Sequence, residues 1–333
     1  MKSRIVALSL SLLLFFASLH LIGFAEDKVD ADATAQTETS VTAETTETTT
    51  KETVTEPKTE TIVCSFKDIS YGSSEDNKLD LHLPVDDREE TGLVLFLHGG
   101  GWIAGDKAAV KKNFGVLKEN KNYATASINY RLAETGKTDI YDIINDITAA
   151  ISHIKTLAAG YSVNITKVVL CGHSAGGHLA LLYAYRYKDI SPVTPVGVFV
   201  TSPAVELSLD EFYKSNSLGD EKHMCELMSK ACGETFTPQT RAGYEKLLKE
   251  LSPTEYVTED SVPTLIAHGK KDTVAPYKGS EILSEKLTAF SVNHDLITFE
   301  NSGHTLDKDK ETRDYTETLL QERINSWLGI ETN

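Results

Sequence analysis

The sequence predicts an α/β fold in which a mostly parallel, twisted sheet carries helices on both faces. After about residue 90, short apolar runs of strand character alternate with longer helical patterns, which is typical of a parallel sheet. The chain has 333 residues. About 270 of them remain once an N-terminal leader and a linker are set aside, and that length fits one domain.

The first 25 residues have the features of a secretory signal peptide. Lys2 and Arg4 precede an apolar run over residues 5–19, and small residues before Glu26 provide a cleavage site. We therefore expect a secreted or cell-surface protein with no stable membrane span after cleavage. An uncleaved membrane anchor is the alternative, since the apolar stretch is almost long enough to cross a bilayer.

Residues 26–61 form a linker dominated by Thr, Glu and Ala. It holds 10 acidic and 3 basic residues, a net charge of −7, and has too few apolar side chains to fold, so we expect disorder. The chain carries −16 in total and the leader +2, so residues 62–333, the expected catalytic domain, carry −11. A domain this acidic does not favour nucleic acid as a partner.

The elements of the domain follow in a regular order. Strands near 66–71 and 78–83, separated by turn residues, predict an antiparallel lead-in. Further strands are expected near 93–97, 123–128, 167–171, 196–201, 262–268 and 294–299. Helices are expected near 107–120, 140–158, 175–187, 277–289 and 309–328. Isoleucines at helical spacing over 140–158 predict a core-facing stripe, and Arg131 and Asp146 are expected to pair nearby.

A serine lies between two glycines where an apolar run meets a helical pattern. The run Val168–Cys171 predicts a buried strand, and Gly177–Tyr185 predicts a helix packed behind it. The chain must reverse sharply at Ser174, and Gly172 and Gly176 have no Cβ to clash where the two backbones approach. This arrangement of strand, nucleophile and helix is that of a G-x-S-x-G motif, and it predicts Ser174 as a nucleophile.

A glycine-rich loop follows the expected strand at 93–97. Its sequence, over His98–Trp102, is HGGGW. Glycines let backbone N–H groups converge on the oxyanion of a tetrahedral intermediate, and removal of one such donor costs about 2.7 to 4 kcal/mol. We expect the N–H groups of Gly100, Gly101 and Ala175 to form this oxyanion hole.

Two further polar residues each follow a strand downstream of the serine. Asp272 comes after the strand at 262–268, and His304 comes after the strand at 294–299. Carboxyl ends of parallel strands meet at one edge of a sheet, where such folds bind ligands. His304 would accept the proton of Ser174 as the hydroxyl attacks, and Asp272 would orient and stabilise the imidazolium.

Other histidines and acids compete for these roles. They are His98, His173, His178, His268 and His294 for the base, and Asp260 and Asp307 for the acid. His98 and His173 belong to the loops described above, whereas His268 and His294 lie within or at the start of strands. We therefore prefer His304 and Asp272.

Five segments together resemble a known family. They are HGGGW (98–102), NYRLA (129–133), GHSAGGHLA (172–180), HGKKD (268–272) and SGH (302–304). They resemble the α/β-hydrolase carboxylesterases of the hormone-sensitive-lipase and feruloyl-esterase-like (BD-FAE-like) group, over about residues 62–330. The resemblance implies an α/β-hydrolase fold. It also implies hydrolysis of esters of small acyl groups, acetylated or feruloylated sugars, or sometimes aryl formamides. It carries the triad roles onto Ser174, Asp272 and His304.

The substrate is the least determined feature. Residues 204–253 mix apolar and charged side chains, as expected of short amphipathic helices, and we expect them to form a small helical cap over the pocket. Trp102 and His173 are expected to line the same pocket, which would take a small-molecule or carbohydrate ester. After NYRLA the chain continues with Glu134–Gly136 and departs from the family, which often has a proline and an acidic residue there.

The sequence contains no metal-ligand cluster, phosphate loop or dinucleotide fingerprint, so no metal and no cofactor are expected. Cys171 is expected to be a buried thiol. Cys225 and Cys232 would lie about 10.5 Å apart on one continuous helix, beyond the roughly 7 Å limit for a disulfide, so they pair only if that helix ends between them.

Two other function classes stay open. A serine peptidase, amidase or arylformamidase on the same fold would use the same triad, because ester and amide hydrolysis share intermediates. A noncatalytic hydrolase-like binding module is the other alternative. Such a module usually loses a triad residue, whereas this chain keeps all three.

Overall fold

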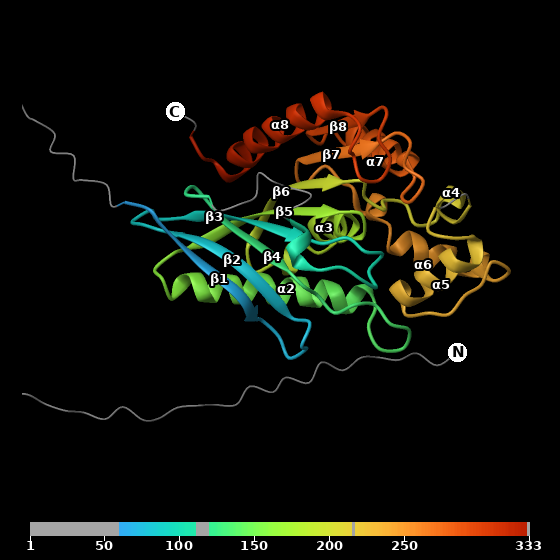
Figure 1. Ribbon diagram of the computed structural model, residues 1–333, viewed down its shortest axis with the longest axis horizontal. Helices are drawn as coiled ribbons and strands as arrows, with labels where there is room; N and C mark the ends of the chain where they lie inside the picture. Colours follow the sequence, from blue (N-terminus) through green and yellow to red (C-terminus); the bar gives the residue numbers. More distant parts are fainter. Residues whose placement is uncertain (1–59, 111–119, 215–216, 332–333) are drawn as a thin grey trace, which may run out of the picture. The chain divides into compact units, whose positions relative to one another are not determined.

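The computed structural model describes residues 60–110, 120–214 and 217–331. In these ranges the chain forms an eight-stranded sheet with helices on both faces (Figure 1). The strand order is β1-β2-β4-β3-β5-β6-β7-β8. The mostly parallel α/β sheet predicted from the sequence is confirmed.

Three predictions concern residues outside the described ranges. The leader at 1–25 lies wholly outside them, and so does almost all of the linker at 26–61. The helix predicted over 107–120 falls there too, except for the 3-10 turn η1 (Lys107–Ala109), which is described. The domain boundaries therefore stay predictions.

The sheet begins with the antiparallel lead-in expected from the sequence. β1 (Ile62–Ser70) pairs antiparallel with β2 (Lys78–Val85), and β2 pairs antiparallel with β4 (Ala124–Ile128). The pairing of β1 shifts register between Phe66 and Ile69.

The other pairs of the sheet are parallel. They join β3 (Thr91–Leu97) to β4 and to β5 (Ile165–His173), and continue through β6 (Thr194–Thr201), β7 (Thr264–Gly269) and β8 (His294–Phe299). Every residue of β3 is buried, as expected of a parallel strand covered on both faces. Because these strands run the same way, β3 and β5 to β8 all end at one edge, the carboxyl edge of the sheet.

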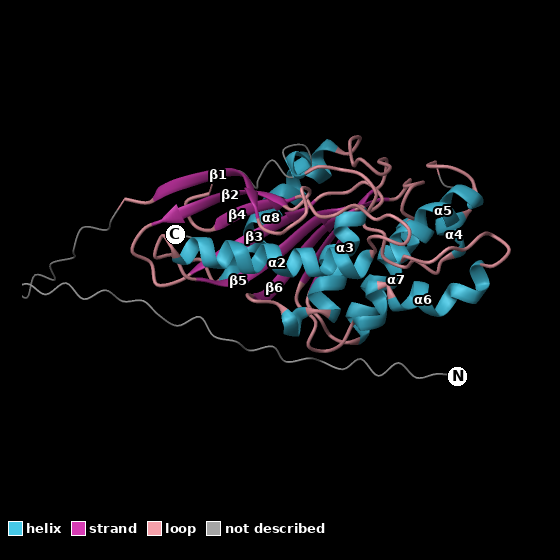
Figure 2. Cartoon of the chain, turned by 90° about the horizontal axis from the view of Figure 1, so that it is seen from below, coloured by secondary structure: helices cyan, strands magenta, loops and turns pink. Residues whose placement is uncertain are grey.

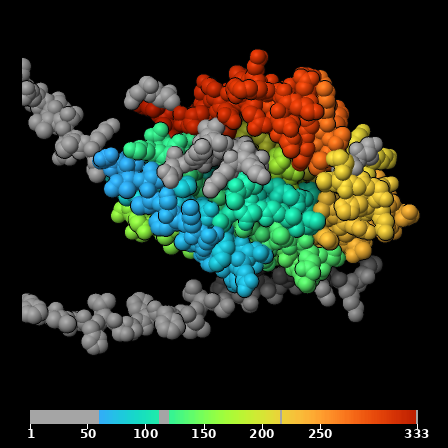
Figure 3. All heavy atoms as spheres, viewed as in Figure 1, coloured from blue at the N-terminus to red at the C-terminus, as the bar shows by residue number. Residues whose placement is uncertain are grey.

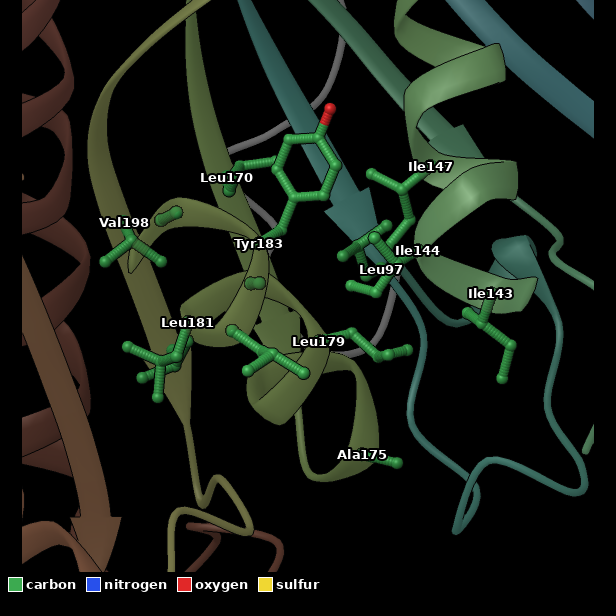
Figure 4. Close-up of a cluster of buried hydrophobic side chains, with 14 of the residues drawn as sticks. Leu97, Ile143, Ile144, Ile147, Leu170, Ala175, Leu179, Leu181, Tyr183 and Val198 are labelled. Carbon is green, nitrogen blue, oxygen red and sulfur yellow. The ribbon is translucent and has the colours of Figure 1, made fainter. Parts of the chain in front are cut away.

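Helices cover the two faces of the sheet. They are α2 (Ile140–Ala159), α3 (Ala175–Arg186) and α7 (Tyr277–Ala289) on one face, and α8 (Lys310–Leu328) on the other (Figures 1 and 2). The side chains of β3 alternate between these layers, with Leu95 in the core of α2 and α3 and Phe96 in the core of α8. The predicted isoleucine stripe of α2 faces α3, where Ile144 and Ile147 lie close to Leu179 and Tyr183 (Figure 4).

Helix α2 starts where a capping residue satisfies its first N–H groups. The Asp139 side chain accepts from the N–H of Asp142, and the Asp142 side chain accepts in return from the N–H of Asp139. One turn later Asp146 accepts from Arg131, with Nε to Oδ2 at 3.0 Å and Nη2 to Oδ1 at 2.9 Å. The predicted pair of Arg131 and Asp146 is confirmed as a structural tie between α2 and the loop after β4.

A small helical cap lies between β6 and β7, at the carboxyl edge of the sheet (Figures 1 and 3). It contains α4 (Asp210–Tyr213), α5 (Glu221–Cys232), η3 (Arg241–Tyr244), α6 (Glu245–Glu250) and η4 (Pro253–Tyr256). The Arg241 guanidinium lies 4.3 Å from the Tyr213 ring centroid and 2.6 Å from an oxygen of Asp210. Together these contacts join η3 to α4.

The described part of the chain also shows the state of its cysteines and the character of its helices. Cys225 and Cys232 lie on the continuous helix α5 and both are free thiols, as is the buried Cys171. Within the described ranges, no helix has the length and apolar character needed to cross a bilayer.

Candidate active site

Ser174 lies at the turn between β5 and α3, in a strained backbone conformation. Its φ is 55° and its ψ is −121°, a combination that residues other than glycine rarely adopt. A Cβ on Gly172 would lie 2.2 Å from the carbonyl oxygen of Gly176, and a Cβ on Gly176 would lie 2.1 Å from that of Leu97. Both positions therefore require glycine, which is the reason the sequence suggested for the sharp reversal.

Backbone hydrogen bonds hold this turn in place. The N–H of Ser174 donates to the carbonyl oxygen of Thr201 at the end of β6, with N to O at 2.9 Å. The carbonyl oxygen of Ser174 accepts from the N–H of His178 at 3.0 Å, in the first turn of α3. The strain is thus sustained by the neighbouring strand and helix, and the serine side chain stays partly exposed.

The glycine loop after β3 packs directly on this serine. A Cβ on Gly99 would lie 2.9 Å from the carbonyl oxygen of His173 and 3.1 Å from the Cβ of Ser174. Gly100 and Gly101 both have positive φ, of 119° and 59°. Among the described residues, neither of these two N–H groups donates to a backbone acceptor. Both N–H groups thus lack a backbone partner in this part of the chain, as the donors of an oxyanion hole must.

The glycine loop is anchored through Trp102. The indole N–H donates to Nδ1 of His178 at 3.2 Å, and Nε2 of His178 donates to the carbonyl oxygen of Leu251 at 2.7 Å. Trp102 also has a positive φ, of 63°, and is only 1% exposed. The sequence suggested that Trp102 lines the pocket. The structure places its side chain in the hydrophobic core instead, where its apolar rings are buried and its N–H finds an acceptor.

The predicted acid and base are in direct contact. Nδ1 of His304 lies 2.7 Å from Oδ2 of Asp272, while the other oxygen of Asp272 accepts from the N–H groups of Val274 and Ala275 at 2.8 and 3.0 Å. Neither alternative acid, Asp260 or Asp307, has this contact among the described hydrogen bonds, and both are exposed.

Electrostatics keep Asp272 ionised. Its side chain is fully buried, and burial alone would raise the pKa. Hydrogen bonds from His268 and His304 outweigh that effect and hold the pKa of Asp272 well below its ordinary value. Asp272 therefore carries a negative charge at neutral pH, directly behind the imidazole of His304.

His173 connects the loop after β8 that carries His304, here called the histidine loop, to the turn at Ser174. Its ring lies 4.9 Å from that of His304, centroid to centroid, and its Nδ1 lies 3.0 Å from Oγ1 of Thr201. Burial, and then the neighbouring His304, lower the pKa of His173 to about 3, so this ring is neutral near pH 7. The contact brings His304 beside the residue that precedes Ser174.

His173 also borders a cavity behind the histidine loop. The cavity has a volume of about 40 Å³ and lies between β6, β7, β8 and α8. Phe199, Phe299 and Leu306 supply apolar walls, and Thr305 lies at its edge directly after His304. A cavity of this size has room for only a few water molecules, so the expected place of His173 in the substrate pocket stays a prediction.

His268 is a residue of the site that sequence reasoning missed. Its Nε2 lies 3.1 Å from Oδ2 of Asp272 and 3.0 Å from the carbonyl oxygen of Ala275. Its position in a strand argued against a role as the base, and nothing in the alternation of the strand indicated that its ring turns back toward the acid. The spacing of the HGKKD segment was the available signal, because a tight turn after β7 returns the chain toward the strand end.

The cap touches both loops that flank the serine. A Cβ on Gly101 would lie 3.2 Å from Cδ1 of Leu227 on α5, so this leucine rests on the glycine loop. The N–H of Ser217 donates to the carbonyl oxygen of Thr273, next to the acid, at 2.9 Å. In the described ranges, no group of three or more His, Cys, Asp or Glu side chains could hold a metal ion.

Comparison with known proteins identifies relatives of the chain. The family model described as BD-FAE matches residues 79–287. The probable isoprenylcysteine alpha-carbonyl methylesterase of Oryza sativa subsp. japonica is 26% identical over 254 residues, which cover 72% of this chain and 58% of the relative. This chain therefore spans little more than half of that relative's length.

Solved structures with the same fold are also similar. Esterase B from Lactobacillus rhamnosis, in complex with an inhibitor, has a TM-score of 0.63 and 21% identity, over 80% of this chain and 87% of that chain. A truncated carbohydrate esterase from gut microbiota has a TM-score of 0.61 and 20% identity, over 78% of this chain and 96% of that chain. At such identities the likeness shows the fold alone, and that fold is the α/β-hydrolase fold.

Proposed function

Because the chain belongs to the BD-FAE family of α/β-hydrolase esterases, we propose that it is a serine carboxylesterase acting through an acyl-enzyme. The observation that supports this most strongly is the 2.7 Å contact between His304 and the buried Asp272, beside the strained turn at Ser174. A base held by a carboxylate near a partly exposed serine is the arrangement that activates serine.

The first half of the reaction forms the acyl-enzyme. Oγ of Ser174 attacks the carbonyl carbon of the ester, and Nε2 of His304 takes the hydroxyl proton. Asp272 keeps Nδ1 of His304 protonated and stabilises the imidazolium that forms. The tetrahedral intermediate then collapses, and the alcohol leaves with the proton from His304.

The second half returns the enzyme to its starting state. Water gives a proton to His304 and attacks the acyl group, and the carboxylic acid is released as Ser174 regains its proton. In both halves the N–H groups of Gly100, Gly101 and Ala175 would bind the oxyanion. The two glycine N–H groups lack backbone acceptors among the described residues, which supports this role.

The proposed substrates are esters of small acyl groups on small molecules or carbohydrates, including acetylated or feruloylated sugars. Two observations support this class. Leu227 of the cap rests on the glycine loop and restricts the space above it, which favours a short acyl group. The truncated carbohydrate esterase from gut microbiota also shares this fold. The charge of −11 over residues 62–333 disfavours anionic polymers such as nucleic acid.

The proposed location is outside the cytoplasm. The leader at 1–25 supports export, and the acidic linker at 26–61 would keep the domain at residues 62–333 clear of whatever precedes it. Expression of the full chain with detection of its N-terminus before and after export tests both proposals. A mature chain that begins near Glu26 supports export with cleavage, and a chain at the cell surface that keeps Met1 indicates the uncleaved anchor. A chain that keeps Met1 and stays in the cytoplasm contradicts the proposed location.

The proposed reaction is tested by comparing ester and amide substrates. We expect hydrolysis of p-nitrophenyl acetate by the wild type and its loss in Ser174→Ala, while Ser152→Ala, an exposed serine on α2, retains it. Faster turnover of an aminoacyl anilide would indicate a peptidase or amidase instead. Equal activity in Ser174→Ala and the wild type would contradict the proposal, and no hydrolysis of either substrate by a folded wild type would indicate a binding module.

A further inference from the structure

The structure assigns a positioning role to His268: its ring shares the carboxylate oxygen of Asp272 with the catalytic base and sets how strongly that oxygen holds His304. The assignment rests on the proposed function, because it concerns the same triad. It names a residue that acts through Asp272 and does not itself touch the substrate.

The carboxylate of Asp272 is saturated with donors. Oδ1 accepts from the N–H groups of Val274 and Ala275 at 2.8 and 3.0 Å. Oδ2 accepts from Nδ1 of His304 at 2.7 Å and lies 3.1 Å from Nε2 of His268. Two oxygens offer about four lone-pair sites, and four protein donors occupy them. The side chain is fully buried, so changing one donor changes the charge left for the others.

The tautomer of His268 follows from its partners. Nε2 faces Oδ2 of Asp272 and the carbonyl oxygen of Ala275, which can only accept, so Nε2 carries a proton. Nδ1 lies 2.7 Å from Oγ of Ser280 on α7, and that hydroxyl can donate to it. His268 therefore donates from Nε2 toward Asp272, in a fully buried position.

Sharing Oδ2 weakens the hold of Asp272 on His304. Each N–H that donates to Oδ2 withdraws negative charge from it, so the bond to the other imidazole is less strong than it would be alone. An imidazolium at His304 is then less stabilised, and the ring returns its proton to the leaving group more readily. His268 would thus keep the base from being trapped in its protonated form.

Among the described residues, no carboxylate other than Asp272 is hydrogen-bonded to His268 or His304. The titratable groups that face His268 are Asp272, His304 and His173 at the carboxyl edge, together with Tyr277 of α7, whose ring lies 5.5 Å from that of His268. His173 is neutral near pH 7 because burial lowers its pKa. Asp272 is therefore the charge through which His268 acts on His304.

The test is the pH dependence of Ser174 modification by a fluorophosphonate, which needs no knowledge of the natural substrate. In His268→Leu, Oδ2 of Asp272 keeps only His304 as a side-chain donor. We expect the acid limb of the modification rate to move about one pH unit higher.

Matched variants separate positioning from stability. His268→Gln keeps an amide donor that can reach the same oxygen, and we expect its acid limb to return toward that of the wild type. Tyr185→Phe removes another buried hydrogen bond to β7, between Tyr185 and Thr264 at 2.7 Å, and should leave the limb unmoved. An unmoved acid limb in folded His268→Leu would overturn the assignment. If that variant fails to fold, Ser280→Ala decides, with a smaller shift in the same direction expected and no shift overturning the assignment.

A second measurement needs no reaction at all. The low-field proton resonance of the His304 Nδ1–H reports the strength of its bond to Asp272, and we expect it to move further downfield in His268→Leu, or in Ser280→Ala if that variant is the one that folds. An unchanged resonance would overturn the assignment. Absence of labelling at Ser174 in the wild type would count against the proposed function, while the resonance would still test His268.

Discussion

The two sides of Ser174 differ in how their hydrogen-bonding groups are used. On the side toward β7 and β8, all four acceptor sites of Asp272 have donors. On the side toward β3, the N–H groups of Gly100 and Gly101 have no backbone acceptor among the described residues. The first side holds a charge that is present throughout the reaction, and a buried permanent charge must be fully solvated by the protein. The second side would meet a charge that exists only in the intermediate, so its donors must stay open.

The two sides also differ in how they are held. The acid and histidine are fixed by side-chain hydrogen bonds, such as those of His268 and His304 to Asp272. The glycine loop is fixed by backbone conformations with positive φ and by the buried anchor Trp102. Substitutions on the first side should therefore act through charge, and substitutions on the second side through backbone geometry.

Removing the charge behind His304 should have the largest effect. In Asp272→Asn the amide carries no charge, and its NH₂ group cannot accept from the two imidazoles. By analogy with other serine triads we expect kcat for p-nitrophenyl acetate to fall about 10³- to 10⁴-fold. Asp307→Asn, an exposed acid three residues after His304, serves as the control and should retain its activity. Similar losses in the two variants would show that Asp272 has no special role.

Displacing the glycine loop should have the next largest effect. In Gly100→Ala the new Cβ would lie 2.1 Å from the carbonyl oxygen of Ala104, at a φ of 119° that side chains rarely adopt, so the loop must move. We expect kcat to fall on the order of 10²- to 10³-fold with a smaller change in KM, as for loss of an oxyanion donor.

A control for this variant is available in a turn away from the site. Gly136 also has a positive φ, of 75°, but a Cβ there would meet nothing within 4 Å. We expect Gly136→Ala to cost some stability and to leave kcat unchanged. If Gly100→Ala kept full kcat and bound a phosphonate analogue of the intermediate as tightly as the wild type, the glycine loop would not be the oxyanion site.

Much of this arrangement follows from the order of residues along the chain. The sequence predicted all eight strands of the described sheet to within a few residues. The clearest apolar runs belong to central strands such as β3, β4 and β7, because parallel strands buried on both faces require them. Because Ser174, Asp272 and His304 each follow such a run, the sequence could place all three at one edge of the sheet.

Side-chain direction could not be predicted in the same way. The return of His268 toward Asp272 depends on the turn in which the N–H of Asp272 donates to the carbonyl oxygen of Gly269. The burial of Trp102 depends on the distant acceptor His178, which belongs to another element. Such contacts are set by tertiary packing, so local patterns contain little information about them.

The smallest expected effect is a loss of folding stability at acid pH when His178, which anchors Trp102 and so the glycine loop, becomes protonated. It is also the sharpest test of that anchor. Burial lowers the pKa of His178 from 6.5 to about 4, so the folded protein keeps this ring neutral where the unfolded chain would protonate it. Its contribution to stability is complete above pH 6.5 and is lost as the pH falls toward 4, by on the order of 3 kcal/mol. His173 acts in the same direction, so only part of the acid sensitivity belongs to His178.

His178→Gln removes the titrating group and keeps both an acceptor for Trp102 and a donor for Leu251. We expect thermal unfolding midpoints between pH 6.5 and 4 to fall less steeply in this variant than in the wild type, with kcat at pH 7.5 reduced only a few-fold. His223→Gln, at an exposed position on α5, should leave the slope unchanged. Parallel slopes in the wild type and His178→Gln would mean that the neutral ring does not anchor the loop. Packing alone would then sustain the positive φ of Trp102. In that case hydrogen bonds would hold the acid and histidine on one side of Ser174, and only the backbone conformation and packing would hold the glycine loop on the other.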